Sequence, residues 1–189
     1  VSSLLYPLYG VSDDRSTAVI SGSPSYALTK TGMGTLELVS GSATYGNTAI
    51  QAGTLSVRSD ALSSGDVSVA SGATLNINTT TLRAPSSIQL SGTGVGGAGA
   101  LTGSGAAAYS GNLVLSGAAA VGATAGSTLS LTGNRSGGGN FTKLGAGTVV
   151  LGGAAAAHSG TTTIATGILT AASNTAFGMG SVTVDSGAT

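Results

Sequence analysis

The sequence predicts an all-β chain whose parallel strands wind into a solenoid. Apolar residues come in pairs two positions apart, with a small or polar residue between them, which is the period of a strand with one buried face. A strand at Thr35–Leu38 recurs as Thr54–Val57 and again as Thr74–Ile77, at nearly equal intervals. No stretch long enough for a helix shows the 3.6-residue period. A strand that returns regularly without a helix in between indicates one coil of a stacked solenoid.

The chain also contains an internal duplication, because residues 28–75 are repeated at 141–189. The matched segments are strands, and the offset between the copies grows slightly from their start to their end. Small insertions therefore fall in the loops, and the two copies share their strands. A repeat of this kind predicts that neighbouring units stack to bury one continuous core.

We expect the apolar members of the strand pairs to point inward. The predicted core residues are Leu36, Leu38, Leu55, Val57, Val67, Val69, Val149, Leu151, Val182 and Val184. Eight or nine coils at the ~4.8 Å spacing of paired strands would make a rod roughly 40 Å long.

The composition limits the classes of protein to which the chain can belong. A length of 189 residues suffices for one domain with a sizeable core. Six basic residues balance six acidic ones, so no field attracts nucleic acid or anionic lipid, and we predict no nucleic-acid partner. Glycine- and serine-rich chains are often disordered, but the regular alternation of Val, Leu and Ile argues against a linker.

The residues that are missing exclude several kinds of chemistry. The chain has no cysteine, which excludes disulfides, thiolate metal sites and a cysteine nucleophile. No apolar run reaches the ~20 residues of a membrane-spanning helix. The sequence starts at Val1 without a signal peptide and ends within a motif at residues 186–189. We therefore expect a processed product or a fragment of a longer chain.

The N-terminal segment, residues 1–25, differs from the remainder. It holds two of the three prolines and a charge cluster at residues 13–15, together with Tyr6 and Tyr9. Proline has no backbone N–H to donate to a neighbouring strand, so it discourages further strand pairing at the edge of a sheet. Two interpretations of this segment stay open: a cap over the first coil, or an arm that docks on a neighbouring molecule through Tyr6, Pro7 and Tyr9.

Residues 26–189 are predicted to form the β-helix repeat domain, with looser coils between the two copies. In that middle region we expect strands at Ser87–Leu90, Asn112–Leu115 and Thr128–Leu131, and a loop over residues 92–105.

Three motifs in the copies resemble a known family. They read Thr-Lys-x-Gly-x-Gly-Thr-Leu-x-Leu, then Ala-Gly-Thr-Leu-x-Val, then Gly-x-Val-x-Val-x-Ser-Gly-Ala-Thr-Leu, at Thr29–Leu75 and again at Thr142–Thr189. This pattern resembles the passenger-associated transport repeat of autotransporter passenger domains. The resemblance implies a right-handed single-stranded parallel β-helix displayed outside a Gram-negative-type cell. The chain departs from the pattern at Ile168 and in a loop at Ala154–Ala157.

Two apparent chemical motifs lack their structural context. Gly94–Gly99 spells the dinucleotide-binding glycine pattern, but no helix follows to hold a pyrophosphate. His158 and Ser159, with Asp185, are candidates for a catalytic triad, yet we interpret His158 as a polar loop residue. The glycine-rich loops also lack the Asp of calcium-binding nonapeptides. We predict no catalytic, cofactor-binding or metal-binding residue, and no cofactor.

Two further sets of polar residues are interpreted as surface features. Glu37, Asp60 and Asp66 share the first copy with Arg58, and a glycan-cleaving enzyme would need such acids clustered on one face. The acceptor-like sequences at Asn78, Asn134 and Asn140 are interpreted as turn asparagines, which can also form ladders between coils.

The sequence therefore favours a non-enzymatic, extracellular or bacterial cell-surface structural or adhesive segment: the stalk of an autotransporter passenger, serving adhesion or biofilm formation. A second hypothesis is the subunit of a self-assembling extracellular filament. No cap follows Ser181–Val184, so one copy's first coil could stack on another's last, and a head-to-tail contact propagates. A carbohydrate-active enzyme is the third hypothesis.

Overall fold

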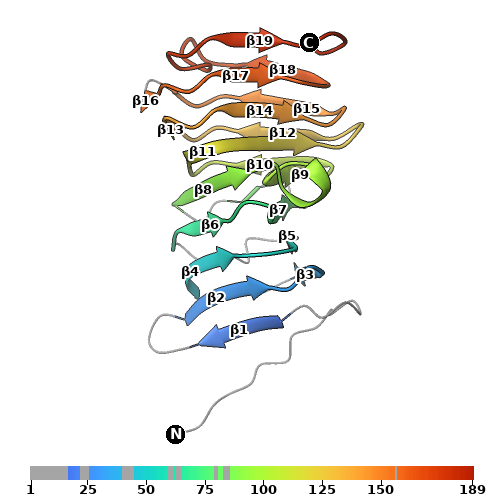
Figure 1. Cartoon of the computed structure of the whole chain (residues 1–189), viewed down its shortest axis with the longest axis vertical. Helices are drawn as coiled ribbons and strands as arrows, with labels where there is room; N and C mark the ends of the chain where they lie inside the picture. The colour runs from blue at the N-terminus through green and yellow to red at the C-terminus, as the bar shows by residue number, and fades with distance from the viewer. Residues whose placement is uncertain are drawn as a thin grey trace, which may run out of the picture.

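The computed structural model describes residues 17–21, 26–39, 45–58, 62, 65–78, 81–82, 86–155 and 157–189. The described strands stack one above another into a rod, with β1 at one end and β19 at the other (Figure 1). Together they form a β-solenoid of about seven turns, which confirms the predicted all-β parallel architecture.

The elements follow one another along the chain as strands joined by short turns, with one 3₁₀ turn among the described residues. In chain order they are β1 (Thr17–Ser21), β2 (Tyr26–Thr31), β3 (Thr35–Leu38), β4 (Tyr45–Ile50), β5 (Thr54–Val57), β6 (Val67–Val69), β7 (Thr74–Ile77), β8 (Ser87–Gly92), η1 (Val95–Gly97), β9 (Leu101–Gly103), β10 (Ala106–Tyr109), β11 (Asn112–Ala123), β12 (Thr128–Leu131), β13 (Arg135–Gly137), β14 (Phe141–Leu144), β15 (Thr148–Leu151), β16 (Ala157–His158), β17 (Thr162–Ile164), β18 (Ile168–Ala171) and β19 (Val182–Val184).

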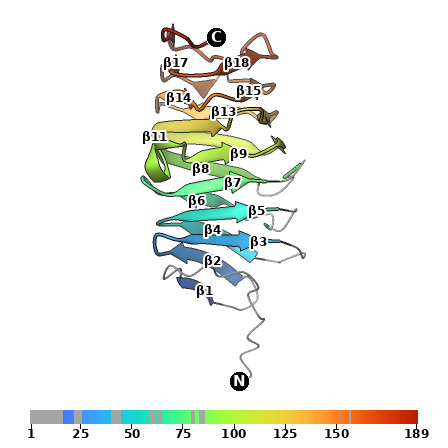
Figure 2. The same ribbon diagram turned by 90° about the vertical axis from the view of Figure 1, so that its right-hand side faces the viewer.

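Parallel ladders run along the rod. In the first half one ladder joins β2, β4, β6 and β8, and a second joins β3, β5, β7 and β9. A third ladder, β10–β12–β15–β18, begins in the middle of the chain. Strand β11 links the first two ladders, because its start pairs with β8 and β13 and its end pairs with β9 and β14. Figure 2 shows the stack from the side, with β3, β5, β7 and β9 rising in order.

Strand β1 is the exception to parallel pairing. It runs antiparallel to β2, with Thr17 opposite Thr31 and Ser21 opposite Ala27. Its backbone therefore covers one edge of the first parallel strand, which is where the sequence predicts a cap or docking arm. Tyr6, Pro7 and Tyr9 lie outside the described residues, so this interpretation of residues 1–25 stays a prediction.

The register stacks like residues above like residues in the core. Leu36, Leu55, Leu75 and Leu101 are successive partners along one ladder, and all four are buried. Removing apolar surface from water contributes about 25 cal/mol per Å², so such columns replace the single large core of a globular domain. The residue between each inward pair points outward, as the two-residue period predicts.

Eight of the ten predicted core residues are buried, from Leu36 to Leu151. The prediction is wrong for Val182 and Val184, which are 42% and 54% exposed on β19. Both pair in register with the coil below, as Thr162↔Val182 and Ile164↔Val184. Burial in a solenoid needs a coil on each side, and no described coil lies above β19.

Three other expectations need correction. The stack has about seven turns rather than eight or nine, and β1 adds no parallel coil because parallel pairing begins only at β2. The loop expected over residues 92–105 contains η1 and β9. Strand β11 also continues well beyond the expected Asn112–Leu115, as far as Ala123. The strand expected at Thr128–Leu131 is confirmed as β12.

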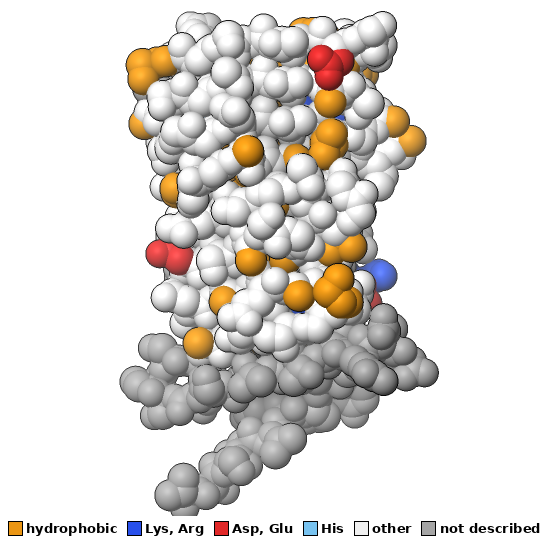
Figure 3. All heavy atoms as spheres, in the orientation of Figure 1, with side chains coloured by type: hydrophobic (Ala, Val, Ile, Leu, Met, Phe, Trp, Pro, Cys, Tyr) orange, Lys and Arg blue, Asp and Glu red, His pale blue; other side chains and the backbone are white. Residues whose placement is uncertain are grey.

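The outer surface carries little charge. On the face shown in Figure 3, acidic and basic side chains are few and scattered. A few large apolar side chains are exposed, for example Met33 and Met179. No helix among the described residues is long and apolar enough to cross a membrane.

Placing a charge in one leucine column tests the fold. Leu55 on β5 is fully buried between Leu36 and Leu75, so Leu55→Asp buries a carboxylate without a partner. We expect a loss of about 4 kcal/mol or more, which unfolds the surrounding coils. Ser68→Asp, on the exposed face of β6, should change stability by only about 0.5 kcal/mol. Urea denaturation followed by circular dichroism measures both, and equal effects would contradict the fold.

Candidate functional site

The chain has two lysines, Lys30 and Lys143, and both are completely buried. They hold the same place in the two copies, two residues after Leu28 in β2 and two residues after Phe141 in β14. Because side chains alternate along a strand, the residue two after an inward residue also points inward. The strand period therefore places an ammonium group inside the solenoid.

The ammonium of Lys143 is held by three backbone carbonyl groups. Its Nζ donates to the oxygens of Leu144 at 3.0 Å, Gly145 at 2.6 Å and Thr166 at 2.9 Å. The first two belong to the turn that follows β14, and Thr166 belongs to the next coil. All three N–H donors of the ammonium are thereby satisfied.

Lys30 repeats this arrangement in the first copy. Its Nζ donates to the oxygens of Thr31 at 2.9 Å, Gly32 at 2.8 Å and Ala52 at 3.1 Å. Again two acceptors come from the lysine's own turn and one from the next coil. Neither ammonium pairs with an acid in the described part of the chain, so carbonyl dipoles alone balance its charge. We call each lysine with its three carbonyls a lysine corner.

Glycines make the lysine corner possible. Gly145 has a φ of 76°, a conformation that other residues rarely adopt. Gly167, on the next coil, lies so close that an added Cβ would be 2.3 Å from the Gly145 oxygen and 2.7 Å from Lys143 Nζ. Gly53 has the same place above Gly32, with an added Cβ 2.5 Å from that oxygen. The motif's lysine and its glycines thus belong to one structural unit.

Burial and hydrogen bonding act on the lysine charge in opposite directions. Three carbonyl acceptors favour the ammonium, whereas loss of water disfavours it. Burial prevails and lowers the pKa of Lys143 from 10.5 to about 8, and it lowers the pKa of Lys30 as well. At neutral pH Lys143 is therefore still mostly charged, at a cost in solvation.

Sequence reasoning missed this feature. Lysine is normally a surface residue, so a lysine within a motif raises no expectation of burial. The available signal was its distribution: a chain with only two lysines places both at the same position of its repeat.

A second group of buried polar side chains lies in the coils of β13 to β17. Arg135 donates from Nη2 to the Ala176 oxygen, and its guanidinium lies 4.9 Å from the centre of the Phe141 ring. Burial lowers the pKa of Arg135 to about 10. Buried Arg135 Nε, His158 Nδ1 and Thr162 Oγ1 have no protein hydrogen-bond partner among the described residues.

His158 is a buried strand residue, and its interpretation as a polar loop residue is wrong. It ends β16 with no exposed surface, and Nε2 lies 2.9 Å from the Gly139 oxygen. A carbonyl can only accept, so Nε2 carries the proton. Ser159 and Asp185 are exposed, and no hydrogen bond or ion pair links either side chain to His158 in the described structure. The three residues do not form a triad.

The glycine pattern at residues 94–99 forms a turn that hydrogen bonds to Thr74 hold in place. Val95 N donates to Thr74 Oγ1 at 2.8 Å, and that hydroxyl donates to the Gly99 oxygen at 2.9 Å. The 3₁₀ turn η1 spans only Val95–Gly97, so no α-helix N-terminus is available for a pyrophosphate.

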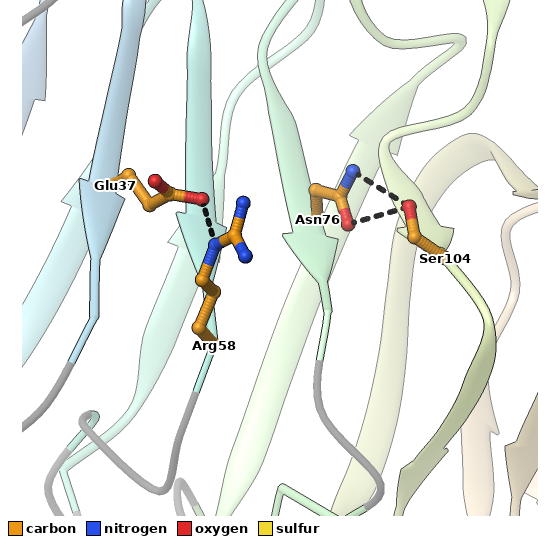
Figure 4. Close-up of polar contacts among 4 residues, drawn as sticks. All are labelled: Glu37, Arg58, Asn76 and Ser104. Carbon is orange, nitrogen blue, oxygen red and sulfur yellow. Dashed lines mark hydrogen bonds and ion pairs between the residues drawn. The ribbon is translucent and has the colours of Figure 1, made fainter.

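The acids of the first copy do not gather on one face. Glu37 pairs with Arg58 across two coils (Figure 4), whereas Asp66 accepts from Ser87 Oγ at 2.8 Å. Asp60 lies outside the described residues. Within the described ranges, no three acidic or histidine side chains lie close enough to hold a metal ion.

Asparagines join coils on the outside. Asn134 N donates to Asn112 Oδ1 at 3.3 Å, and Ala154 N donates to Asn134 Oδ1 at 3.2 Å. The same hydrogen bond is thus repeated between successive coils. Asn140 Oδ1 accepts in the same way from Thr161 N. Figure 4 shows a further pair between coils, Asn76 and Ser104, 3.3 Å apart. This geometry supports the interpretation of Asn134 and Asn140 as turn asparagines.

The geometry defines a parallel β-solenoid whose polar groups mainly bind its own backbone. The family model described as passenger-associated-transport-repeat matches residues 28–57 and 141–171, which include both lysine corners. The chain therefore carries two of these repeats, as predicted, and this is consistent with an autotransporter passenger domain. Comparisons with curated proteins and with solved structures gave no significant match.

The lowered pKa of Lys143 predicts how stability depends on pH. Between about pH 8 and 10.5 the unfolded chain binds more protons than the folded one, so the free energy of unfolding should rise with pH. The contribution of one such group is at most about 1.4 kcal/mol per pH unit. Denaturant titrations of the wild type and Lys143→Met measure it. A wild-type slope in this window no steeper than that of Lys143→Met would contradict the shift.

Because His158 is buried, truncating it should be costly, whereas a polar loop residue could be truncated without loss of stability. Truncation leaves a cavity and an unpaired Gly139 carbonyl, so we expect a loss of about 2–4 kcal/mol. Ser159→Ala, at the next position and exposed, is the matched control and should be neutral. Thermal unfolding compares the two variants, and equal melting temperatures would refute the burial of His158.

Proposed function

We propose that the chain is a non-enzymatic structural segment of an autotransporter passenger, displayed at the bacterial surface and serving adhesion or biofilm formation. The observation that supports this most strongly is that both transport repeats fold into one continuous parallel stack. A stack of this kind becomes longer as coils are added, so it can form a stalk that keeps its far end away from a membrane.

The chemistry of the described residues supports a structural role. The buried cations Lys30, Lys143 and Arg135 are bound to backbone carbonyls of the chain itself. The paired surface charges Glu37 and Arg58 lie on neighbouring coils and are partly exposed. An exposed pair of this kind contributes little free energy and holds no reactive group.

Adhesion by such a surface would use polar, uncharged contacts. A shallow groove of about 290 Å³ runs over β2, β4, β6 and β8 and is lined mainly by uncharged residues, among them Thr29, Ser68 and Gln89, together with the carboxylate of Asp66. Hydroxyl and amide groups donate and accept hydrogen bonds without a charge, so a partner bound through these groups rather than through Asp66 would show little dependence on salt.

A filament subunit is a second candidate because of the last coil. Val182 and Val184 are exposed on β19, and stacking another coil over them would bury both. The added coil could belong to the same chain or to a second copy. The contact is head-to-tail, so a second copy would extend the stack without closing it.

Neutralising the acids tests whether the function depends on carboxylates, as it would in a glycan-cleaving enzyme. Glu37, Asp66 and Asp185 are the acids among the described residues. Cells that display the triple variant Glu37→Gln, Asp66→Asn, Asp185→Asn should adhere within about twofold of wild type, because exposed charges contribute little. Cells that display Leu55→Asp should lose adhesion. A folded triple variant without adhesion would contradict the proposal, and a displayed wild type that does not adhere would remove its adhesive part.

A further inference from the structure

The alternating pattern of inward and outward residues allows neighbouring coils of this chain to pair in more than one register. Inward residues alternate with outward ones, so a coil that slips by one residue turns its apolar side chains outward, but a slip by two keeps them inward. The pairing of β14 with β17 is an example, with Phe141 opposite Thr162 and Lys143 opposite Ile164. A shift of two residues would place Ile164 opposite Phe141. Strands rich in glycine and small residues oppose such slips only weakly.

We propose that the buried lysine of each repeat fixes the register of the coil that stacks on it. Two hydrogen bonds, to the Leu144 and Gly145 oxygens, hold the Lys143 ammonium on its own turn. The third bond, to Thr166 at 2.9 Å, depends on where the next coil lies. A slip of two residues moves that carbonyl by roughly 6.6 Å, beyond hydrogen-bond reach.

The slipped stack would leave a buried ammonium donor unpaired. Losing one hydrogen bond of a charged group shifts an equilibrium by roughly ten- to a hundredfold. Gly167 permits the close approach of the two coils but supplies no attraction, because it has no side chain. The ammonium therefore supplies the specific attraction between the coils at this corner.

The first repeat contains the same device at the same position. Lys30 reaches the Ala52 oxygen, which immediately precedes Gly53, as Thr166 immediately precedes Gly167. In both copies an isoleucine is the register partner of the lysine, Ile50 for Lys30 and Ile164 for Lys143. Two corners far apart in the chain thus use one lysine and one carbonyl of the next coil for the same contact.

Cysteine pairs can report the register, because the chain has no cysteine of its own. Thr142 and Thr163 are register partners, so Thr142→Cys with Thr163→Cys reports the native stack. Thr142→Cys with Ala165→Cys reports a slip of two residues. In the native register this second pair is about 8 Å apart between Cα atoms, which is too far for a disulfide.

In the wild-type background we expect mild oxidation to link only the native pair. In the Lys143→Met background the slipped pair should cross-link at least about tenfold more than in wild type, because the discriminating bond is gone. Leu151→Ala is the control, since it destabilises the same coil through a cavity without touching the corner. Leu151→Ala should leave the slipped pair at the wild-type level.

Lys143→Met that links only the native pair would overturn the proposal, as would equal slipping in Leu151→Ala. If Lys143→Met does not fold by circular dichroism, Lys30→Met tests the first repeat, with Thr29→Cys and Ala49→Cys as the native pair. Thr29→Cys with Gln51→Cys is then the slipped pair. If neither lysine variant folds, the lysines are needed for folding itself rather than for the choice of register, and the proposal fails.

Discussion

The structure depends on how the corners of a narrow solenoid with an apolar core are closed. At a corner the ladder of strand pairing is interrupted, and backbone carbonyls that turn inward must find a donor, because an unpaired buried polar group costs free energy. In both repeats the donor is a lysine ammonium that binds two carbonyls of its own turn and one of the next coil. One side chain thus closes a turn and joins two coils.

The same constraint accounts for other polar groups in the chain. Inside the solenoid, Arg135 and His158 bind backbone oxygens, and Thr74 bridges the turn before β9. Outside, side chains such as Asn134 accept backbone N–H groups from the next coil. In other proteins a buried ion can often be replaced by an apolar residue. Here, replacing the lysine would leave three buried carbonyls without a hydrogen-bond donor. Most of these polar groups bind the chain's own backbone, and the chain has only six basic and six acidic residues in all.

Much of the fold follows from the sequence, and the failures have physical reasons. Thr35–Leu38, Thr54–Val57 and Thr74–Ile77 are strands with the predicted bounds, because an alternating apolar pattern begins there after a small residue. The length of β11 and the existence of β9 were missed, since alanine and glycine give no side-chain pattern. Burial of the lysines depends on contacts between coils, which a strand period alone does not reveal.

The central claim is that each lysine ammonium is bound inside the stack by carbonyls of two coils. Nuclear magnetic resonance of the ¹⁵N-labelled lysine side chains tests it directly. We predict two ammonium signals that exchange slowly with water, each with hydrogen-bond couplings to carbonyl carbons of its own turn and of the next coil, Ala52 for Lys30 and Thr166 for Lys143. Lysine ammonium groups that exchange as fast as free lysine, with no such coupling, would contradict the account.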